Sequence, residues 1–462
     1  SLLGVVFFII CKLKYKEKFA SHVDVLIDDE IVDEEENREE EVKAAIELVM
    51  AEEDETKFVQ PIAFNYNLPV NIAFGTGEVA QTGELTKPYG KKALIVTGRS
   101  SAKKSGLYDK VNDSLKAAGL ETALFDKVAQ NPLTTTAMEG AEFAKANGCD
   151  VVVAIGGGSI MDCAKAIAFL ALNDGDINDY IFGRKTGDTA LPLVLIPTTC
   201  GTGSEVTSFA VITDKEQGKK YPLTAYELTP NVAIVDPDFV STLPKSLTAD
   251  TGMDVLTHAL EAYVSNMATD YTDALAEKAT KLVFENLEEA YNHGDNKYAR
   301  ERMHNASTMA GMAFSNAFLG ICHSMAHKLG AVFHLPHGRI NAILLPYVVE
   351  YNGSKPTKFT SFPKYEYYMA DEKYAKIAKM VGLKADTVEE GVHSLAEAIR
   401  KMNKDINIPA SFKEAGVDEQ EFLDNVDKLA DRAFEDQCTP ANPRLPLVTE
   451  IKKILLDSYY GK

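Results

Sequence analysis

The stretch VVVAIGGGSIMDCAKAIAFL, residues 151–170, joins an apolar run to a helical pattern through three consecutive glycines. Residues 151–155 are uncharged and mostly β-branched, which is typical of a strand in a parallel sheet. The glycines let the backbone approach a phosphate, and the following helix offers free N–H groups and a positive dipole end. The stretch predicts a strand, a pyrophosphate-binding turn and a helix, although its spacing differs from G-x-G-x-x-G. A tight turn without a ligand is the competing interpretation.

The same alternation of short β-rich runs and helical patterns continues on both sides. Further strands are predicted at residues 70–74, 92–97, 121–125, 191–196 and 232–235, with helices at 105–118 and 134–147. Such alternation indicates a parallel sheet with helices on both faces. After about Leu247 the strand patterns stop, and helical patterns follow at residues 248–265, 274–291, 299–314, 316–332 and 389–404.

These patterns predict an α/β plus all-α fold in which the cleft between two domains is the active site. Residues 61–247 form the expected Rossmann-like, parallel-sheet dinucleotide domain, and residues 248–462 the expected all-helical metal-binding and catalytic domain. Residues 1–60 are expected to be an acidic extension, because Asp24 to Glu55 contains 16 acidic and 2 basic residues. We expect this extension to be largely disordered, with one short amphipathic helix at residues 42–50.

Net charge, the length of the apolar runs and the cysteine pattern limit the kinds of partner and location that the chain is expected to have. The net charge of −20 and the lack of a basic stripe argue against a nucleic-acid partner. The apolar run at residues 2–10 is too short to span a bilayer, which takes about 20 residues, so no membrane span is established. Six cysteines without a C-x-x-C pair fit free thiols in a reducing cytoplasm.

A second loop also follows a predicted strand and carries groups suited to a cofactor. Residues 197–205, PTTCGTGSE, combine four hydroxyl side chains with two glycines. Hydroxyls and exposed amides bind ribose, phosphate and a nicotinamide carboxamide. Two such loops at strand ends predict a dinucleotide site.

The helical half concentrates metal-ligand residue types. His323 and His327 are four residues apart on one predicted helix, and His337 follows closely. Asp254 and His258 form a second pair at the same spacing. Residues four apart lie on one face of a helix, and nitrogen and oxygen donors suit Fe(II) or Zn(II) better than Mg(II) or Ca(II). Spacing alone leaves open which histidines are ligands, and ordinary buried or surface histidines are the competing interpretation.

From about Phe64 to Lys462 the chain resembles the iron-dependent (group III) alcohol dehydrogenases. The resemblance rests on residues 74–77, 156–162, 197–205, 252–261 and 323–337. Residues 220–223, 323–330, 355–358 and 436–444 are similar, more specifically, to the alcohol dehydrogenase half of bifunctional aldehyde–alcohol dehydrogenases. We expect the aldehyde dehydrogenase half to be missing, because residues 1–60 are too short for it and carry none of its motifs.

The resemblance implies roles for individual residues. The implied metal ligands are Asp254, His258, His323 and His337, and His327 becomes a catalytic proton-relay residue near the substrate. The implied pyrophosphate-binding residues are Gly157, Gly158 and Ser159, and the rest of the cofactor site is lined by Asp162, Thr198, Thr199, Thr202 and Lys220.

One position departs from NAD-specific relatives. Those proteins carry an Asp after the second strand, where it accepts a hydrogen bond from the ribose 2′-hydroxyl. Gly98 stands there in this chain, followed by Arg99, Ser100 and Lys103, which are able to bind a 2′-phosphate. The pattern favours NADP(H) and leaves NAD(H) open. The competing interpretation is that Gly98 only turns the chain.

The expected activity is reversible hydride transfer between a nicotinamide and a short-chain aldehyde or primary alcohol, assisted by Fe(II), with Zn(II) as the other metal that these ligands accept. A lactaldehyde/propanediol-type diol oxidoreductase is the first alternative. A metal-dependent hydrolase or lyase is less favoured, because it gives no reason for two dinucleotide loops. The family further implies a homodimer.

Overall fold

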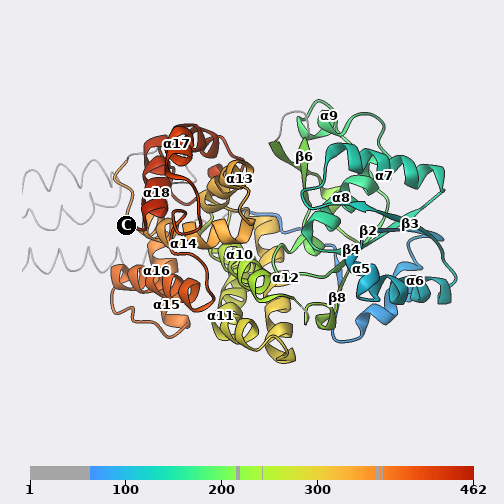
Figure 1. Ribbon diagram of the computed structural model, residues 1–462, viewed down its shortest axis with the longest axis horizontal. Helices are drawn as coiled ribbons and strands as arrows, with labels where there is room; N and C mark the ends of the chain where they lie inside the picture. The colour runs from blue at the N-terminus through green and yellow to red at the C-terminus, as the bar shows by residue number, and fades with distance from the viewer. Residues whose placement is uncertain (1–62, 215–218, 242, 359–364, 366–367) are drawn as a thin grey trace, which may run out of the picture. The chain divides into compact units, whose positions relative to one another are not determined.

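Six parallel strands form the first half of the fold (Figure 1). In the sheet order β1-β8-β5-β4-β2-β3 they are β1 (Asn71–Phe74), β8 (Val232–Val235), β5 (Leu193–Pro197), β4 (Val151–Gly156), β2 (Lys92–Gly98) and β3 (Glu121–Val128). This computed structural model describes residues 63–214, 219–241, 243–358, 365 and 368–462. The acidic stretch and the short helix predicted within residues 1–60 lie outside this range. Tyr66–Lys462 form one compact unit.

Strand β4 explains why its sequence is apolar without a break. Val152 and Ala154 pack into a core that includes residues of α7 (Thr134–Ala146) and α8 (Gly158–Leu170). Val151, Val153 and Ile155 face the opposite core, formed with α6 (Leu107–Ala117). Successive side chains of a strand point to opposite faces, so a strand covered on both sides has no polar face. The predicted parallel sheet with helices on both faces is confirmed.

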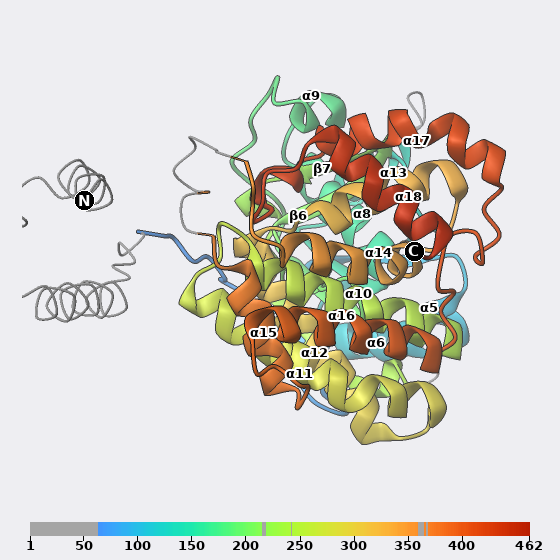
Figure 2. The same ribbon diagram turned by 90° about the vertical axis from the view of Figure 1, so that its left-hand side faces the viewer.

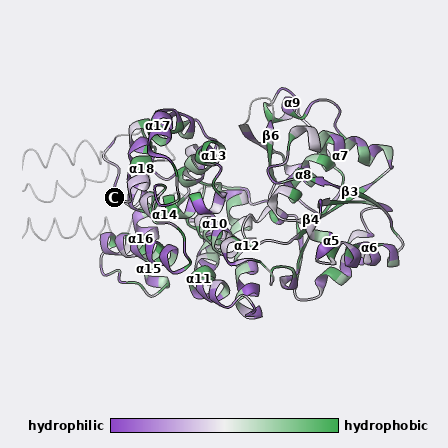
Figure 3. Ribbon diagram, in the orientation of Figure 1, coloured by the Kyte–Doolittle hydropathy of each residue, from purple (hydrophilic) through white to green (hydrophobic). Residues whose placement is uncertain are grey.

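The second half of the described chain is helical, as predicted. It comprises α10 (Lys245–Val264), α11 (Asp270–Asn292), α12 (Lys297–Ala317), α13 (Ile321–Phe333), α14 (His337–Asn352), α15 (Ala370–Met380), α16 (Val388–Asp405), α17 (Glu419–Phe434) and α18 (Val448–Tyr460). Helix α10 lies among α11, α12, α14 and α15 and contacts all four (Figure 2). Most of its residues are buried. Helices α16 and α17 bury one side only and carry much hydrophilic surface (Figure 3). Among the described residues, no helix combines the length and apolarity that crossing a membrane requires.

Two local features differ from the sequence-based expectation. An antiparallel hairpin of β6 (Phe209–Asp214) and β7 (Lys219–Thr224) stands apart from the main sheet and was not predicted. The helix predicted at residues 316–332 instead begins at Ile321, because α12 ends at Ala317 and Phe318 has a φ of +61°. A non-glycine residue in this conformation interrupts a right-handed helix. The predicted boundaries at residues 61, 247 and 248 stay a prediction, although the strands of the main sheet end at Val235 and α10 begins at Lys245.

Candidate metal and cofactor site

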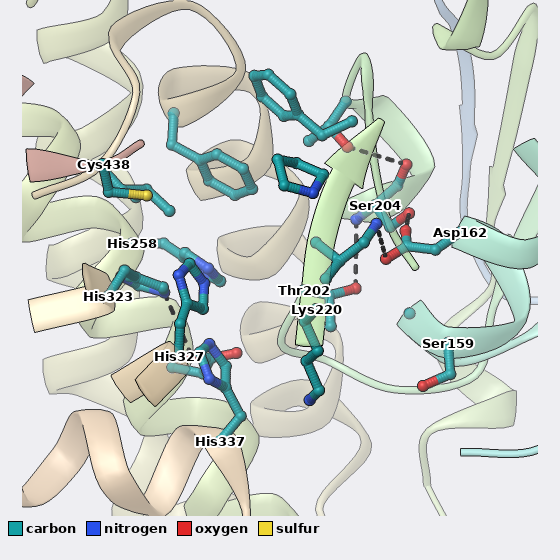
Figure 4. Close-up of a pocket in the computed structure, with 18 of the residues that line it drawn as sticks. Ser159, Asp162, Thr202, Ser204, Lys220, His258, His323, His327, His337 and Cys438 are labelled. Atoms are coloured by element: carbon teal, nitrogen blue, oxygen red, sulfur yellow. Dashed lines mark hydrogen bonds and ion pairs between the residues drawn. The ribbon is translucent and has the colours of Figure 1, made fainter. Parts of the chain in front are cut away.

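A cavity of about 330 Å³ is lined by both halves of the fold. Gly158 and Ser159 contribute from the first turn of α8, just after β4, and Thr202 from the loop that follows β5, at the carboxyl edge of the sheet. The histidines of α10, α13 and α14 contribute the facing wall, as Figure 4 shows. Ligands of parallel α/β sheets bind at this edge of the sheet. The cavity therefore brings together the two groups of motifs that the sequence placed in separate halves.

Four predicted metal ligands converge on one wall. Asp254 and His258 lie on α10, His323 on α13, and His337 is the first residue of α14. Oδ1 of Asp254 is 3.8 Å from Nε2 of His323 and 3.7 Å from Nε2 of His337. The donor atoms of Asp254, His258 and His323 all lie within 4.8 Å of one another.

Electrostatics prepare these donors for a cation. Burial lowers the pKa of His323 well below its usual value, which keeps its imidazole neutral and its lone pair available. Burial alone would raise the pKa of Asp254, but the attraction of the adjoining histidines in their protonated form lowers it below its usual range, so Asp254 is a carboxylate. Burial also lowers the pKa of His337 to about 3. A carboxylate beside neutral rings at His323 and His337 is the protonation state that a divalent metal needs.

The side chain of Asn341 gives independent evidence that the donors suit a cation. Its amide nitrogen is 2.8 Å from Oδ1 of Asp254, 3.1 Å from Nε2 of His323 and 3.2 Å from Nε2 of His337. An amide nitrogen has two N–H bonds, yet three acceptor atoms converge on it here. This convergence on one electropositive group fits a metal ion, and the residues present therefore suit Fe(II) or Zn(II).

Glu261 holds one of the proposed metal ligands, His323, in place. The sequence analysis did not single out this residue. Its carboxylate accepts a hydrogen bond from Nδ1 of His323 at 2.5 Å and from the backbone N–H of Cys322 at 2.7 Å. Burial raises the pKa of Glu261 to about 7. A carboxylate on Nδ1 fixes the ring orientation and leaves Nε2 free to bind a metal. The available signal was its position on α10, three residues after His258 and on the same face.

His327 has a carboxylate partner of its own. Nδ1 of His327 is 3.1 Å from Oδ2 of Asp436, and the Lys328 ammonium donates to the same oxygen at 2.6 Å. Burial would raise the pKa of Asp436, but His327 and Lys328 hold it well below its usual value. His327 lines the cavity, and its ring centroid is 6.1 Å from that of His323. No local pattern pairs Asp436 with His327, because the two residues are 109 positions apart.

The glycine turn after β4 packs directly on the loop after β5. A Cβ atom on Gly158 would lie 2.6 Å from Cγ2 of Thr202, and one on Gly157 would lie 3.1 Å from Cγ2 of Thr199. Glycine is therefore required for the two loops to meet, and the backbone at the start of α8 stays accessible from the cavity. An open backbone at a helix N-terminus suits a pyrophosphate.

The remaining predicted cofactor residues divide into two groups. Ser159, Asp162, Thr202 and Lys220 line the cavity with Gly158, whereas Thr198 and Thr199 do not, although both belong to the adjoining loop. Asp162 accepts hydrogen bonds from Oγ of Ser204 at 2.7 Å and from the Val211 backbone at 3.0 Å. Burial raises the pKa of Asp162. Its oxygens thus anchor the loop and β6 within the protein.

Three residues after β3, Gln130, Asn131 and Pro132, also line the cavity and were not predicted. Gln130 and Asn131 face the same space as Ser159, and the Asn131 backbone lies 3.4 Å from Oγ of Ser159. Asn131 has a φ of +55°, which Asn tolerates better than most residues. An Asn-Pro pair after a strand was the available turn signal.

The proposed 2′-phosphate segment lies at the end of β2, outside the residues that line the cavity. Arg99 and Ser100 are exposed, whereas Lys103 forms an ion pair with Asp126 at 2.5 Å. A Cβ on Gly98 would come no closer than 3.4 Å to a neighbouring atom, Cδ1 of Ile160. Space and backbone conformation therefore do not require glycine at this position.

The loop after β5 and helix α12 meet at a pair of glycines. A Cβ on Gly203, which has a φ of +59°, would lie 2.6 Å from Cα of Gly311 on α12. A Cβ on Gly311 would lie 2.8 Å from Cα of Gly203. Next to this contact, Oγ1 of Thr308 donates to the buried Glu205 at 2.8 Å.

A glycine turn at the edge of the sheet faces an Asp/His donor set across the cavity, and comparison with known proteins gives the family. Residues 69–237 match the model for iron-containing alcohol dehydrogenases, and residues 248–459 match the model for the C-terminal part of the Fe-containing alcohol dehydrogenase family. The chain belongs to the iron-containing alcohol dehydrogenase family.

Particular relatives include both longer and similarly sized proteins. The chain is 50% identical over 389 residues to the aldehyde-alcohol dehydrogenase of Streptococcus pneumoniae serotype 4, which covers 80% of this chain and 43% of that protein. It is 45% identical over 400 residues to the NADPH-dependent butanol dehydrogenase of Clostridium saccharobutylicum, covering 86% and 98%. A solved 1,3-propanediol oxidoreductase is 37% identical, with a TM-score of 0.79 over 86% of this chain and 100% of that one. The chain thus spans less than half the length of the aldehyde-alcohol dehydrogenase it matches.

Proposed function

We propose that this chain is a metal-dependent, NAD(P)H-linked alcohol dehydrogenase that interconverts short-chain primary alcohols and aldehydes by hydride transfer. One observation carries the proposal: the donor set around Asp254 and the glycine turn at Gly158 line the same cavity. A metal-dependent hydrolase or lyase would not need the second of these features. Membership of the iron-containing alcohol dehydrogenase family supports the same activity.

Asp254, His258, His323 and His337 would hold the metal, with Fe(II) favoured and Zn(II) accepted by the same donors. When bound, the ion supplies Lewis acidity that polarises a carbonyl group. Glu261 keeps His323 in the tautomer whose Nε2 faces Asp254. The aromatic rings of Phe209, Phe314 and Phe318 pack together along the cavity and exclude water from it.

His327 would handle the proton. Its Nδ1 is bound to Asp436, so Nε2 is the ring atom left to exchange a proton with the substrate oxygen. Asp436 acts on this step through His327, because its carboxylate sets the orientation of the ring. The backbone at Gly157, Gly158 and Ser159 would bind the cofactor pyrophosphate and orient the nicotinamide toward this wall.

NADP(H) is the proposed preferred cofactor, with NAD(H) as the weaker one. The support is local: Gly98 carries no carboxylate to repel a 2′-phosphate, and Arg99 and Ser100 are exposed beside it. Lys103 is the weaker part of this proposal, since its ammonium is engaged by Asp126. A homodimer and a cytoplasmic location complete the proposal. The dimer rests on family resemblance, and the location on six cysteines without a C-x-x-C pair.

The test is an anaerobic assay of NADPH and NADH oxidation with acetaldehyde, butanal and lactaldehyde. Metal-free protein is reconstituted with Fe(II) or Zn(II), and protein without metal is the control. Metal-dependent oxidation with acetaldehyde or butanal supports the proposal. A clear preference for lactaldehyde favours the second candidate, a diol oxidoreductase, which the likeness to 1,3-propanediol oxidoreductase supports. No oxidation with any aldehyde, despite bound metal, overturns the activity.

A further inference from the structure

A second group of donor side chains lies along the cavity, outside the four residues assigned to the catalytic metal. It consists of His327, Asp436 and Cys438, whose donor atoms all lie within 4.8 Å of one another. Nδ1 of His327 is 3.1 Å from Oδ2 of Asp436. The edge of a tetrahedron with bonds of about 2.0 Å to its centre is about 3.3 Å long. Two of the three donors therefore already have the separation that one tetrahedral ion needs.

The chemistry of this group differs from that of the catalytic set. An imidazole, a carboxylate and a thiol together form a typical ligand set for Zn(II), and sulfur disfavours Mg(II) and Ca(II). Asp436 and Cys438 are almost fully buried, whereas His327 and Cys438 line the cavity. Figure 4 places Cys438 and His327 on the same wall as His258 and His323. A cation would enter through the cavity and keep one coordination position open toward it.

One positive group already occupies part of this site. The Lys328 ammonium is 2.6 Å from Oδ2 of Asp436, the oxygen that His327 also contacts. The other oxygen of Asp436 accepts from the backbone N–H of Cys438 at 3.0 Å. A metal ion would have to displace the ammonium, whose side chain is one-quarter exposed and able to move toward solvent. Because the Lys328 ammonium competes for the same oxygen, the occupancy of the site by metal depends on the metal concentration.

We propose that His327, Asp436 and Cys438 form a second, inhibitory binding site for Zn(II) or another thiophilic divalent cation. Binding forms bonds from the metal to Nδ1 of His327, a carboxylate oxygen of Asp436 and the sulfur of Cys438. The thiol proton leaves to solvent, the Nδ1 proton of His327 is exchanged through solvent to Nε2, and no electron is transferred. The inhibitory part rests on the proposed function, because a metal on Nδ1 removes His327 from its hydrogen bond with Asp436. The binding part does not depend on it.

Sulfur makes the second site separable from the catalytic one by spectroscopy. The catalytic donors are all nitrogen and oxygen, so Co(II) bound there gives no thiolate-to-metal charge-transfer band. The protein is first loaded with one equivalent of Zn(II), which resists displacement because Zn(II) binds more tightly than Co(II) in such sites. Co(II) is then titrated, and the near-ultraviolet spectrum is recorded. We expect a thiolate charge-transfer band that saturates at one Co(II) per chain.

Cys438→Ser identifies the thiol responsible. This variant should lose the band while retaining the first equivalent of Zn(II), which also shows that the variant is folded. Cys438→Ala is the second variant if serine disturbs folding. The absence of a band in the wild type, or a band that survives both substitutions, overturns the proposal. A surviving band would point to Cys322, which is buried next to His323.

Lys328→Met tests the competition. Removing the ammonium should tighten Co(II) binding at the second site by at least about tenfold, the factor that corresponds to a charge-assisted hydrogen bond. Arg339→Met is a matched control, because Arg339 pairs with Asp250 outside the residues that line the cavity. Unchanged affinity in Lys328→Met contradicts the assignment of Oδ2 as the metal-binding oxygen.

Inhibition is measured for each protein as the ratio of the rates of aldehyde reduction with and without the second equivalent of metal. Aldehyde reduction by the wild type should fall at least about tenfold, in line with the catalytic effect of a general acid, and Cys438→Ser should fall far less. If the wild type shows the band but no dehydrogenase activity, the second site stands and the proposed function fails. If activity is present but no band forms, the second site fails and the proposed function stands.

Discussion

Nδ1 of His323 lies 2.5 Å from Oε2 of Glu261, and both side chains are almost completely buried. The same carboxylate holds the backbone N–H of Cys322, so Glu261 fixes both the ring and the first turn of α13. Because His323 is a proposed metal ligand, the carboxylate should act on metal affinity without touching the metal itself.

Replacing Glu261 should therefore weaken metal binding. Glu261→Ala is expected to lower the affinity for Zn(II) by about 10- to 100-fold, and Glu261→Gln by less, because the amide oxygen still accepts from Nδ1. Competition with a chromophoric chelator measures both. Equal affinity in Glu261→Ala and wild type would show that the contact does not orient the ligand.

His327→Ala should slow aldehyde reduction while leaving the catalytic metal bound. A positioned general acid contributes about 10²- to 10⁴-fold, so kcat should fall within that range. Asp436→Asn, which weakens the partner of His327, should reduce kcat in the same direction by a smaller factor. Metal analysis of the purified variants is the control. Metal-free His327→Ala protein would mean that His327 is a ligand.

Gly98→Asp should change the cofactor preference. A Cβ atom is tolerated at Gly98. A carboxylate there would repel a 2′-phosphate, so KM for NADPH should rise at least about tenfold while KM for NADH falls or stays the same. Arg99→Ala is the companion variant. It should weaken the binding of NADPH and leave the binding of NADH unchanged. Equal changes for both cofactors in Gly98→Asp would assign this position a structural role.

Gly158→Ala should damage the cofactor site through Thr202. The new methyl group would lie 2.6 Å from Cγ2 of Thr202, and such overpacking typically costs about 1–3 kcal/mol. Thr202→Ser removes that Cγ2 atom, so the double variant should recover part of the lost stability and cofactor affinity. Thermal unfolding with and without cofactor measures both quantities. Additive effects in the double variant would contradict this contact.

His304 should make the fold sensitive to acid. It is fully buried on α12, neither ring nitrogen has a hydrogen-bond partner within the described structure, and burial lowers its pKa to about 3. Below pH 6.5 the unfolded chain therefore binds more protons than the folded one. The free energy of unfolding decreases as the pH is lowered from 6.5 to about 3. At pH 5 the loss is about 2 kcal/mol relative to neutral pH.

His304→Met should remove this dependence. The difference in unfolding free energy between wild type and variant should shift by about 2 kcal/mol between pH 7.5 and pH 5, because the other titrating groups are shared. Denaturant unfolding at the two pH values measures the shift. A constant difference would place the titration of His304 at its ordinary pKa.

Elements with a local signature were predictable from the sequence, and long-range partners were not. The uninterrupted apolar run of β4 and its glycine turn predicted a doubly covered strand and a helix, which the structure has. Histidines four residues apart predicted a shared helix face. Asp436 contacts His327 across 109 residues and Glu261 contacts His323 across 62, and no periodicity encodes such a pairing.

The break at Phe318 and the hairpin of β6 and β7 show a second limit. A helical pattern continues through Phe318, but its backbone adopts a φ of +61° that the residue type does not favour. Packing against Phe209 on β6, at a ring separation of 5.7 Å, accompanies this conformation. Tertiary contacts therefore override the local pattern where the two halves of the fold meet.

The contact between Gly203 and Gly311 fixes the separation between the two sides of the cavity. Backbone touches backbone there, so the spacing between the nucleotide edge and the metal wall passes through no side chain that substitution could lengthen or shorten by degrees. Hydride transfer depends steeply on the distance between donor and acceptor carbon atoms. A methyl group at either glycine would lie within 2.8 Å of the opposing Cα atom and would have to push the two backbones apart, so the separation of the two sides is set by backbone and not by a side chain.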